Sequence, residues 1–186
     1  MANRSLKSNA ASRAQKLLLE AEVYLTLQRV ADLLLRPVEE TLKTAGLSHT
    51  QYNVLRILRG AYRDAEHHGE GGHEQGVESG GLSCGEIAAR MITRDPDITR
   101  LLDRLEARGL VARSREKKDR RVVQVRITSA GIQLLKKLDK PIYAMHRKQF
   151  AHVPAANLRQ LLEHLKEIRS AVAQIKACAG NEEDSI

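Results

Sequence analysis

A short basic segment in the middle of the chain carries the residue types that bind phosphate. Between Arg113 and Arg126 there are seven Lys or Arg residues and two acidic residues, a net charge of +5 out of the +8 of the whole chain. Guanidinium and ammonium groups donate charge-assisted hydrogen bonds to phosphate oxygens. Five of the cations have too few acids nearby to be neutralised: Arg115, Lys117, Lys118, Arg120 and Arg121. The segment therefore predicts binding to a polyanion, and nucleic acid is the first candidate.

The basic segment also shows the period of two that is typical of β-strands. The runs LVARSR and VVQVRIT flank EKKDRR, and in the second run Val123, Val125 and Ile127 alternate with polar residues. This pattern predicts a two-stranded hairpin with a cationic tip and outer face, its inner face packed on the preceding helices. A hairpin tip is slim enough to enter a DNA minor groove, which is about 6 Å wide. Asp119 is structural in this interpretation, because a carboxylate at a turn accepts backbone amides and orients a neighbouring arginine.

A helix is predicted directly before the hairpin. Its apolar residues recur at helical spacing, at Ile98, Leu101, Leu102 and Leu105. Its opposite face holds Asp97, Thr99, Arg100, Asp103 and Arg104, with Arg94 in the turn just ahead. Arg100 and Arg104 are neighbours on that face, and either guanidinium can bind O6 and N7 of guanine in a major groove. In the alternative interpretation, these arginines pair with Asp97, Asp103 or Glu106 on a solvated face.

Helix start signals place this helix third in a series. S-x-x-Q at Ser48 and S-x-x-E at Ser83 are capping boxes that predict two earlier helices. Asp95 followed by Pro96 predicts the start of the third helix, which ends at Gly109. The order is then a short helix, a four-residue turn at 92–95, a second helix and a basic hairpin. This order predicts a helix-turn-helix followed by a wing.

Residues 64–81 contain six glycines, five acidic residues and no Lys or Arg. Such a composition cannot bury enough apolar surface to offset the entropy of ordering, so we expect a flexible insertion. His67, His68 and His73 raise the alternative of a metal site. The glycine-rich spacing fixes no ligand geometry, and no metal is expected.

Long amphipathic helices are predicted at both ends of the chain. Residues 1–12 are small and polar and should precede the first helix, which Gly46 ends. In the last helix the apolar residues alternate in steps of three and four: Leu158, Leu161, Leu165, Ile168, Val172 and Ile175. This seam can pack on the first helix of the same chain or on a second copy, and we favour a homodimer. The expected division is dimerisation regions at 1–46 and 132–186, with a DNA-binding domain at 47–131 that includes the 64–81 insertion.

The sequence ITRLLDRLEARGLVARSREKKDRRVVQVRITSAG, residues 98–131, resembles the recognition helix and wing of the MarR family of transcriptional regulators. The D-x-R wing motif and the following I-T-x-x-G are distinctive of that family, and GLSHTQYNVLRIL and LSCGEIAARM are similar to its upstream helices. The resemblance spans about residues 17–172. It implies a mainly α fold with a small β-hairpin wing, and a homodimer of two winged helix-turn-helix lobes on a pseudo-palindromic DNA duplex.

The resemblance also implies roles for individual residues. The family's wing arginine falls on Arg121 and its orienting aspartate on Asp119, while the recognition face falls on Arg94, Asp97, Thr99, Arg100 and Arg104. Family members commonly bind small aromatic or phenolic anions between the dimerisation helices and the DNA-binding lobe. Here Tyr24, Gln28, Tyr52 and Arg56 are candidates for such a site, and core packing is their alternative role. The 64–81 insertion is longer than the family's usual connection, and the N-terminal cysteine of its peroxide sensors is absent.

Several other classes of protein are disfavoured. No uninterrupted apolar run of about 18 residues exists, and the N-terminus lacks the order of a signal peptide, so we expect no membrane association and a cytoplasmic protein. Cys84 and Cys178 have no companion at metal-ligand spacing and are expected to be reduced. Neither a phosphate-binding glycine loop nor H-E-x-x-H nor G-x-S-x-G is present, so no catalytic residue or cofactor is expected.

Three functions remain open at this point. The first is a repressor that a small aromatic effector releases from DNA. The second is an architectural DNA-binding protein of the same fold without an effector. The third is a redox-responsive regulator acting through Cys84, which lies in the first turn of a predicted helix, where the dipole favours a thiolate.

Overall fold

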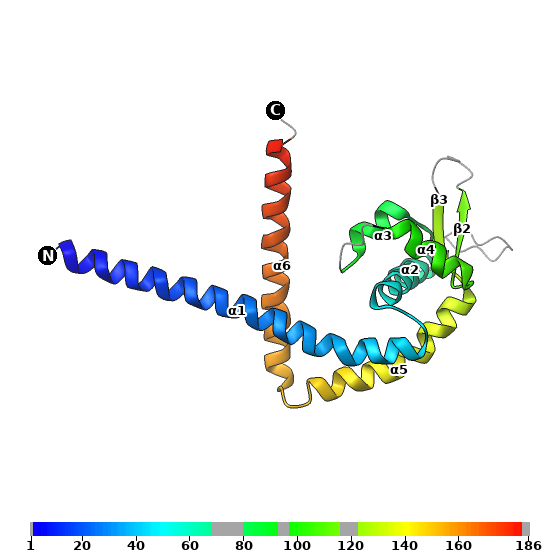
Figure 1. Ribbon diagram of the computed structural model, residues 1–186, viewed down its shortest axis with the longest axis horizontal. Coiled ribbons are helices and arrows are strands. Elements are labelled where there is room, and N and C mark those ends of the chain that lie inside the picture. Colours follow the sequence, from blue (N-terminus) through cyan, green and yellow to red (C-terminus); the bar gives the residue numbers. More distant parts are fainter. Residues whose placement is uncertain (1, 68–79, 93–96, 116–122, 184–186) are drawn as a thin grey trace. The chain divides into compact units, whose positions relative to one another are not determined.

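The computed structural model of this 186-residue chain describes the backbone of residues 2–67, 80–92, 97–115 and 123–183. Side chains are described for residues 18–65, 80–92, 97–115 and 123–175. The chain forms two compact units, Met1–Met145 and His146–Ile186. Helices make up most of both units, and the described strands all belong to the first (Figure 1). This mainly α architecture with a small sheet confirms the predicted fold class.

Helix α1 covers Ala2–Thr44. The expectation that residues 1–12 precede the first helix is wrong, because this stretch contains no Gly or Pro and is rich in Ala, so nothing in it stops the helix. Gly46 ends α1 as predicted, with a φ of 65°. The amides of Gly46 and Leu47 each donate 3.0 Å hydrogen bonds, to the carbonyls of Lys43 and Leu42. These two bonds form the Schellman C-cap.

Helix α2 covers His49–His67 and begins at the predicted capping box. The Ser48 amide donates to Oε1 of Gln51 at 3.0 Å, and the Gln51 amide donates to Oγ of Ser48 at 3.1 Å. The helix includes residues 64–67, so the start of the predicted insertion is helical. Residues 68–79, which include His68 and His73, lie outside the described residues. Their flexible-loop and metal-site interpretations stay predictions.

Helix α3, Cys84–Arg90, also begins at its predicted capping box. The Glu86 carboxylate accepts the Ser83 amide at 2.8 Å, and Oγ of Ser83 accepts the Glu86 amide at 3.3 Å. The hydrogen bond from the Ser83 amide is the main cause of a lowered pKa of Glu86. Both cap bonds predicted from the four-residue motif are therefore present.

Helix α4, Ile98–Ala107, begins later than predicted. Its N-cap is Asp97 rather than Asp95, because the Asp97 carboxylate accepts the Arg100 amide at 3.2 Å. Since α3 ends at Arg90, the connection between the two helices is longer than the predicted four-residue turn. The end of α4 agrees with the prediction, because Gly109 follows its C-cap with a φ of 66°.

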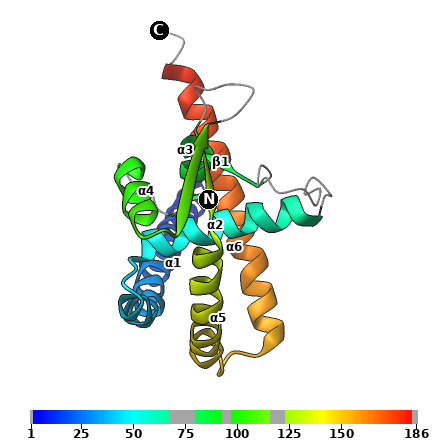
Figure 2. The same ribbon diagram turned by 90° about the vertical axis from the view of Figure 1, so that its right-hand side faces the viewer.

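Three strands form one antiparallel sheet in the order β1-β3-β2: β1 is Leu82–Ser83, β2 is Val111–Arg115 and β3 is Val123–Ile127. The predicted hairpin is β2 and β3, paired from Val111 opposite Ile127 to Arg115 opposite Val123. This hairpin is confirmed, and β1, which the sequence pattern did not indicate, adds a third strand at the other edge of β3. A two-residue strand is too short to show an alternating pattern. Helix α2 crosses the strands and contacts β3 (Figure 2).

The core of the first unit is aliphatic and draws on every element around the sheet. Its largest fully buried side chains are Leu42, Leu55, Leu58, Ile87, Leu102, Leu105, Leu135, Val54, Val111 and Val125. Val125 and Ile127 of β3 are buried, so the inner face of the wing packs on the helices as predicted. This packing is what holds a short hairpin in place.

Helices α5, Ser129–Gln149, and α6, Ala155–Glu183, complete the chain. The break between them falls at the predicted H-V-P sequence, residues 152–154. Within the described ranges, no helix combines the length and apolar character needed to cross a bilayer.

Candidate nucleic-acid interface

Helix α4 has one buried face and one exposed face, as its spacing predicts. Leu101, Leu102 and Leu105 are buried, and Ile98 packs partly buried against them. The residues predicted to lie on the other face are exposed: Asp97, Thr99, Arg100, Asp103 and Arg104. An apolar core thus holds a helix whose outer surface is polar and cationic, which is the arrangement needed to enter a major groove.

Asp97 and Arg100 form a local pair at the start of α4. Besides capping the helix, the Asp97 carboxylate lies 3.1 Å from Nε of Arg100. The Arg100 side chain nevertheless remains 78% exposed. The alternative interpretation, pairing on a solvated face, is therefore correct for Arg100. The Arg100 side chain is still accessible to a ligand. Arg104 forms no ion pair with any residue in the described ranges, so it is the more available of the two cations.

Arg113 on β2 joins the wing to α4, a role that the sequence pattern did not reveal. Its Nη1 donates to Oδ1 of Asp103 at 2.5 Å and to Oε2 of Glu106 at 3.2 Å. Its Nη2 donates to the Thr99 carbonyl at 3.1 Å. One guanidinium therefore contacts three positions along one side of α4. Asp103, which lies on the exposed face of α4 as predicted, is one of the partners of Arg113.

The turn after α3 is held by a buried asparagine. Oδ1 of Asn53 in α2 accepts the Ile92 amide at 3.1 Å, and Asn53 is 7% exposed. This bond holds Ile92, which follows the C-cap residue of α3, against α2. Sequence reasoning missed it because a single asparagine within a helix carries no spacing signal.

The tip of the wing lies outside the described residues. Arg94 belongs to 93–96, and Lys117, Lys118, Asp119, Arg120 and Arg121 belong to 116–122, so their roles stay predictions. Arg115 is the last residue of β2 and is exposed. Nη1 of Arg126 in β3 donates to Oγ of Ser114 at 2.5 Å, so this outer-face cation joins the two wing strands.

The T-x-x-G motif joins the end of α4 to the start of α5. Oγ1 of Thr128 donates to the Gly109 carbonyl at 2.7 Å and accepts the Gly131 amide at 3.1 Å. A Cβ on Gly131 would overlap the carbonyl oxygen of Leu110. Glycine is therefore required at this position, and the motif has a structural role.

The four predicted effector residues form two pairs. On α1, Nε2 of Gln28 donates to the Tyr24 hydroxyl at 2.7 Å, and Tyr24 is exposed. On α2, the Arg56 guanidinium carbon lies 5.7 Å from the centroid of the Tyr52 ring, a cation–π distance. Tyr52 belongs to the core, and this burial raises its pKa. Tyr52 thus has the core-packing role that was the alternative to effector binding. Arg56 lies beside it as an exposed cation.

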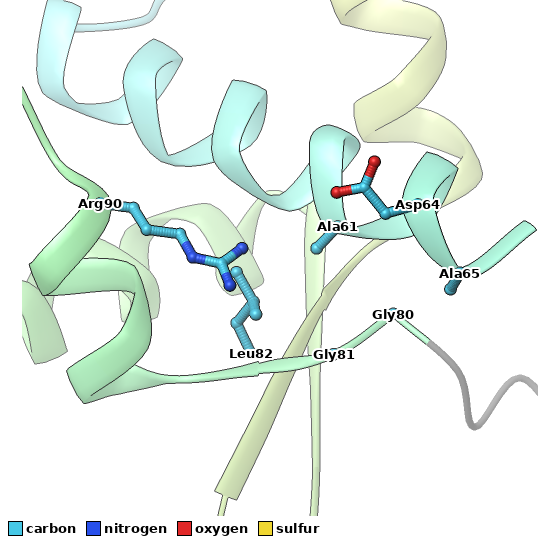
Figure 3. Close-up of a pocket in the computed structure, with 7 residues that line it drawn as sticks. All are labelled: Ala61, Asp64, Ala65, Gly80, Gly81, Leu82 and Arg90. Carbon is cyan, nitrogen blue, oxygen red and sulfur yellow. The ribbon is translucent and has the colours of Figure 1, made fainter. Parts of the chain in front are cut away.

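A pocket of about 310 Å³ lies elsewhere in the first unit. Arg90 of α3 extends toward it, and Asp64 of α2 is among the residues that line it (Figure 3). The other lining residues are Ala61, Ala65, Gly80, Gly81 and Leu82. None of the four predicted effector residues lines this pocket.

Apolar side chains are exposed along both terminal helices. On α6, the predicted seam residues are between 37% and 68% exposed, apart from the half-buried Leu158: Leu161, Leu165, Ile168, Val172 and Ile175. On α1, the exposed apolar residues include Leu18, Leu19, Val23, Leu25, Leu27, Val30 and Leu33. Monomeric soluble proteins rarely expose such extended apolar surfaces.

In the described part of the chain, the cysteine and the potential metal-ligand residues form no evident site. Cys84 is the first residue of α3, and its free thiol is half-buried against the core. The side chain of Cys178 lies outside the described residues. Where side chains are described, no three His, Cys, Asp or Glu residues gather as a metal site would require.

Known proteins with similar sequences are transcriptional regulators. A sequence model of the MarR family matches residues 77–123. The HTH-type transcriptional repressor MdtR of Bacillus subtilis is 28% identical over 113 residues, which is 61% of this chain and 61% of MdtR. The match therefore spans less than two thirds of that relative.

Solved structures support the same fold. The MarR transcription factor from Planctomyces limnophilus is 39% identical, and the match covers 78% of this chain and 93% of that one with a TM-score of 0.54. BpsR of Bordetella bronchiseptica, whose DNA binding is regulated by 6-hydroxynicotinic acid, is 20% identical, covers 77% of this chain and 89% of that one, and has a TM-score of 0.61. The predicted winged helix-turn-helix fold is confirmed, and none of these named proteins is an enzyme.

Proposed function

We propose that this chain, which belongs to the MarR family of transcriptional regulators, is a homodimeric cytoplasmic repressor. A small aromatic or phenolic anion releases it from DNA in this proposal. One observation carries the DNA-binding part. Helix α4 is anchored by buried leucines and presents Thr99, Arg100 and Arg104 to solvent beside a basic wing. In this proposal, residues 47–131 bind DNA, and 1–46 and 132–186 form the dimer.

Each lobe is proposed to contact two grooves of one duplex. Arg104 and Arg100 of α4 enter the major groove, where a guanidinium binds O6 and N7 of guanine. Arg121 enters the adjacent minor groove with Asp119 as its orienting partner, and Arg115, Lys117, Lys118 and Arg120 contact phosphates. Arg94 and Asp97 flank the start of the recognition helix.

Titrations of duplex DNA from upstream of the protein's own gene test this assignment. Wild type, Arg104→Ala, Arg121→Ala and the control Arg36→Ala are compared at several salt concentrations. Arg36 on α1 is exposed, pairs with Asp32 one turn earlier, and belongs neither to the proposed DNA contacts nor to the exposed apolar residues of α1. We expect Arg121→Ala to lose ~1–3 kcal/mol of binding free energy, the control to match wild type, and affinity to fall steeply with salt. Equal binding by all four proteins at every salt concentration would refute the assignment.

The homodimer is proposed from the exposed apolar rows of α1 and α6. A second copy is the occupant that matches a self-complementary row of leucine, isoleucine and valine on a long helix. Sedimentation equilibrium should give twice the chain mass for wild type and a reduced association for the Leu161→Glu/Ile168→Glu double variant. Gln160→Glu, at an exposed polar position of the same helix, is the matched control. A wild-type mass of a single chain at all concentrations would refute the dimer.

The effector is proposed to be an aromatic carboxylate or phenolate. Arg56 supplies an exposed cation against the Tyr52 ring, so it suits an anion with an aromatic face. Tyr24 and Gln28 are the proposed partners from α1. A panel of hydroxybenzoic and hydroxypyridine carboxylic acids should release DNA from wild type and require higher concentrations for Arg56→Gln.

The alternative functions give different outcomes in the same assay. An architectural protein would keep its DNA in the presence of every acid in the panel. A redox regulator would lose DNA on treatment with peroxide, and Cys84→Ser would abolish that loss. Release by an acid, unaffected by Cys84→Ser, supports the proposed function over both.

A further inference from the structure

Helices α1 and α4 end in the same backbone motif. In α4, the amides of Gly109 and Leu110 donate to the carbonyls of Glu106 and Leu105 at 2.8 and 3.0 Å. This repeats the Schellman cap at the end of α1, and both glycines have a positive φ. Such a cap provides donors for two carbonyls of the last helical turn. The carbonyls of the next few residues along the chain have no donor from their own helix.

Arg108, the C-cap residue of α4, supplies the missing donors to α1. Its Nη1 donates to the Gly46 carbonyl at 2.5 Å, and its Nη2 donates to the Ala45 carbonyl at 2.9 Å. The guanidinium also lies at the negative end of the α1 dipole, which favours a cation there. Two carbonyls are bound by one planar fork, a geometry that the single ammonium of lysine does not reproduce.

We propose that Arg108 is a positioning residue, which sets the position of the recognition helix α4 relative to the proposed dimerisation helix α1. The inference rests on the proposed homodimer and its DNA-binding function. Buried contacts around Leu42 and Leu47 also join the end of α1 to the core, but apolar packing is non-directional. The two hydrogen bonds from Arg108 are directional and therefore restrict the angle between the helix ends.

The consequence appears in the spacing of the DNA half-sites. In a dimer of helix-turn-helix lobes, the distance between the two recognition helices must match the distance between half-sites along the duplex. A link from α1 to α4 sets that distance. Weakening the link should let each lobe move, so the dimer should discriminate less between correct and incorrect spacings.

The measured quantity is the ratio of the affinity for a duplex with the correct half-site spacing to the affinity for one with an altered spacing. The probe is a duplex selected from a random pool by the wild-type protein, together with versions that have one base pair added or removed at its centre. Each is titrated with full-length wild type, Arg108→Gln, Arg108→Lys and the matched control Arg36→Gln. We expect Arg108→Gln to reduce the ratio of affinities for correct over altered spacing by about 2- to 30-fold, Arg108→Lys to reduce it less, and Arg36→Gln to keep it.

A purely structural role for Arg108 would lower the active fraction equally on every duplex and leave this ratio unchanged. An unchanged ratio in Arg108→Gln overturns the proposal, as does a wild-type protein without spacing preference. If Arg108→Gln fails to fold, Arg108→Lys carries the comparison. A wild-type protein that selects no duplex refutes the proposed function instead.

Amide hydrogen exchange tests the link without DNA. In Arg108→Gln, the amides of Gly46, Leu47, Gly109 and Leu110 should exchange faster than in wild type, whereas in Arg36→Gln they should not. Faster exchange at both helix ends supports the link between them. Unchanged exchange at both ends overturns it, whatever the DNA measurements give.

Discussion

Arg59 of α2 and Asp139 of α5 form a bidentate ion pair across the first unit. Nη1 of Arg59 donates to Oδ2 of Asp139 at 2.7 Å, and Nη2 donates to Oδ1 at 3.0 Å. The Arg59 side chain is 8% exposed and that of Asp139 is 22% exposed. The hydrogen bond to Asp139 is the main cause of a raised pKa of Arg59, so the guanidinium stays charged in this buried position.

Breaking this pair from one side should destabilise the fold. Asp139→Asn leaves the buried Arg59 cation without a counter-charge, which should cost ~3 kcal/mol of unfolding free energy. Asp32→Asn, which breaks the exposed pair with Arg36, is the control and should leave the urea midpoint unchanged. Urea titrations at one protein concentration measure both. Equal midpoints for the two variants would show that the buried pair adds nothing.

Two glycine substitutions should have opposite effects on stability. Gly131→Ala places a Cβ against the Leu110 carbonyl and the Ile127 side chain, and should destabilise the protein by ~2 kcal/mol or more. Gly60→Ala within α2 meets no atom within 4 Å and should stabilise by ~0.5–1 kcal/mol through helix propensity. Thermal and urea unfolding of both variants measure these changes in stability. Tolerance of Gly131→Ala would contradict the close approach of α5 to Leu110.

Arg113 and Asp103 should be energetically coupled. A double-mutant cycle of Arg113→Gln and Asp103→Asn isolates their interaction, and we expect a coupling of ~1 kcal/mol because Arg113 is largely covered while Asp103 is half exposed. The same cycle on Arg100 and Asp97, which are more exposed, should give a smaller value. Strictly additive effects at Arg113 and Asp103 would mean that this pair does not hold β2 to α4.

Tyr52 should make stability fall at alkaline pH. Burial raises the pKa of its phenol above the ordinary value of 10.0, so the folded state favours the protonated form. The stability that this group contributes is therefore complete below pH 10.0 and is lost as pH rises through its folded pKa. The unfolding free energy of wild type should decline more steeply above pH 10.0 than that of Tyr52→Phe. Parallel declines would place Tyr52 in contact with solvent.

Much of the local structure could be predicted because it depends on residues close together in the chain. The capping boxes at Ser48 and Ser83 and the glycine ends at Gly46 and Gly109 each need only a few consecutive residues. The leucine spacing of α4 likewise determines which face is buried. Some local predictions were wrong: α4 is capped by Asp97 rather than Asp95, two aspartates that the capping signal does not distinguish, and α1 already includes residues 2–12.

The sequence by itself therefore determined the class of fold, the order of the helices and the position of the basic wing, since periodicity and capping act over one or two turns. Only the tertiary structure decided which cations remain exposed and which are bound by other parts of the chain. Arg104 stays exposed without a described partner, whereas Arg113, Arg108 and Arg59 bind groups that other elements bring to them. The physical reason is separation along the chain. Arg108 and Gly46 are 62 positions apart, and Arg59 and Asp139 are 80 positions apart, so each pair meets only after the core has formed.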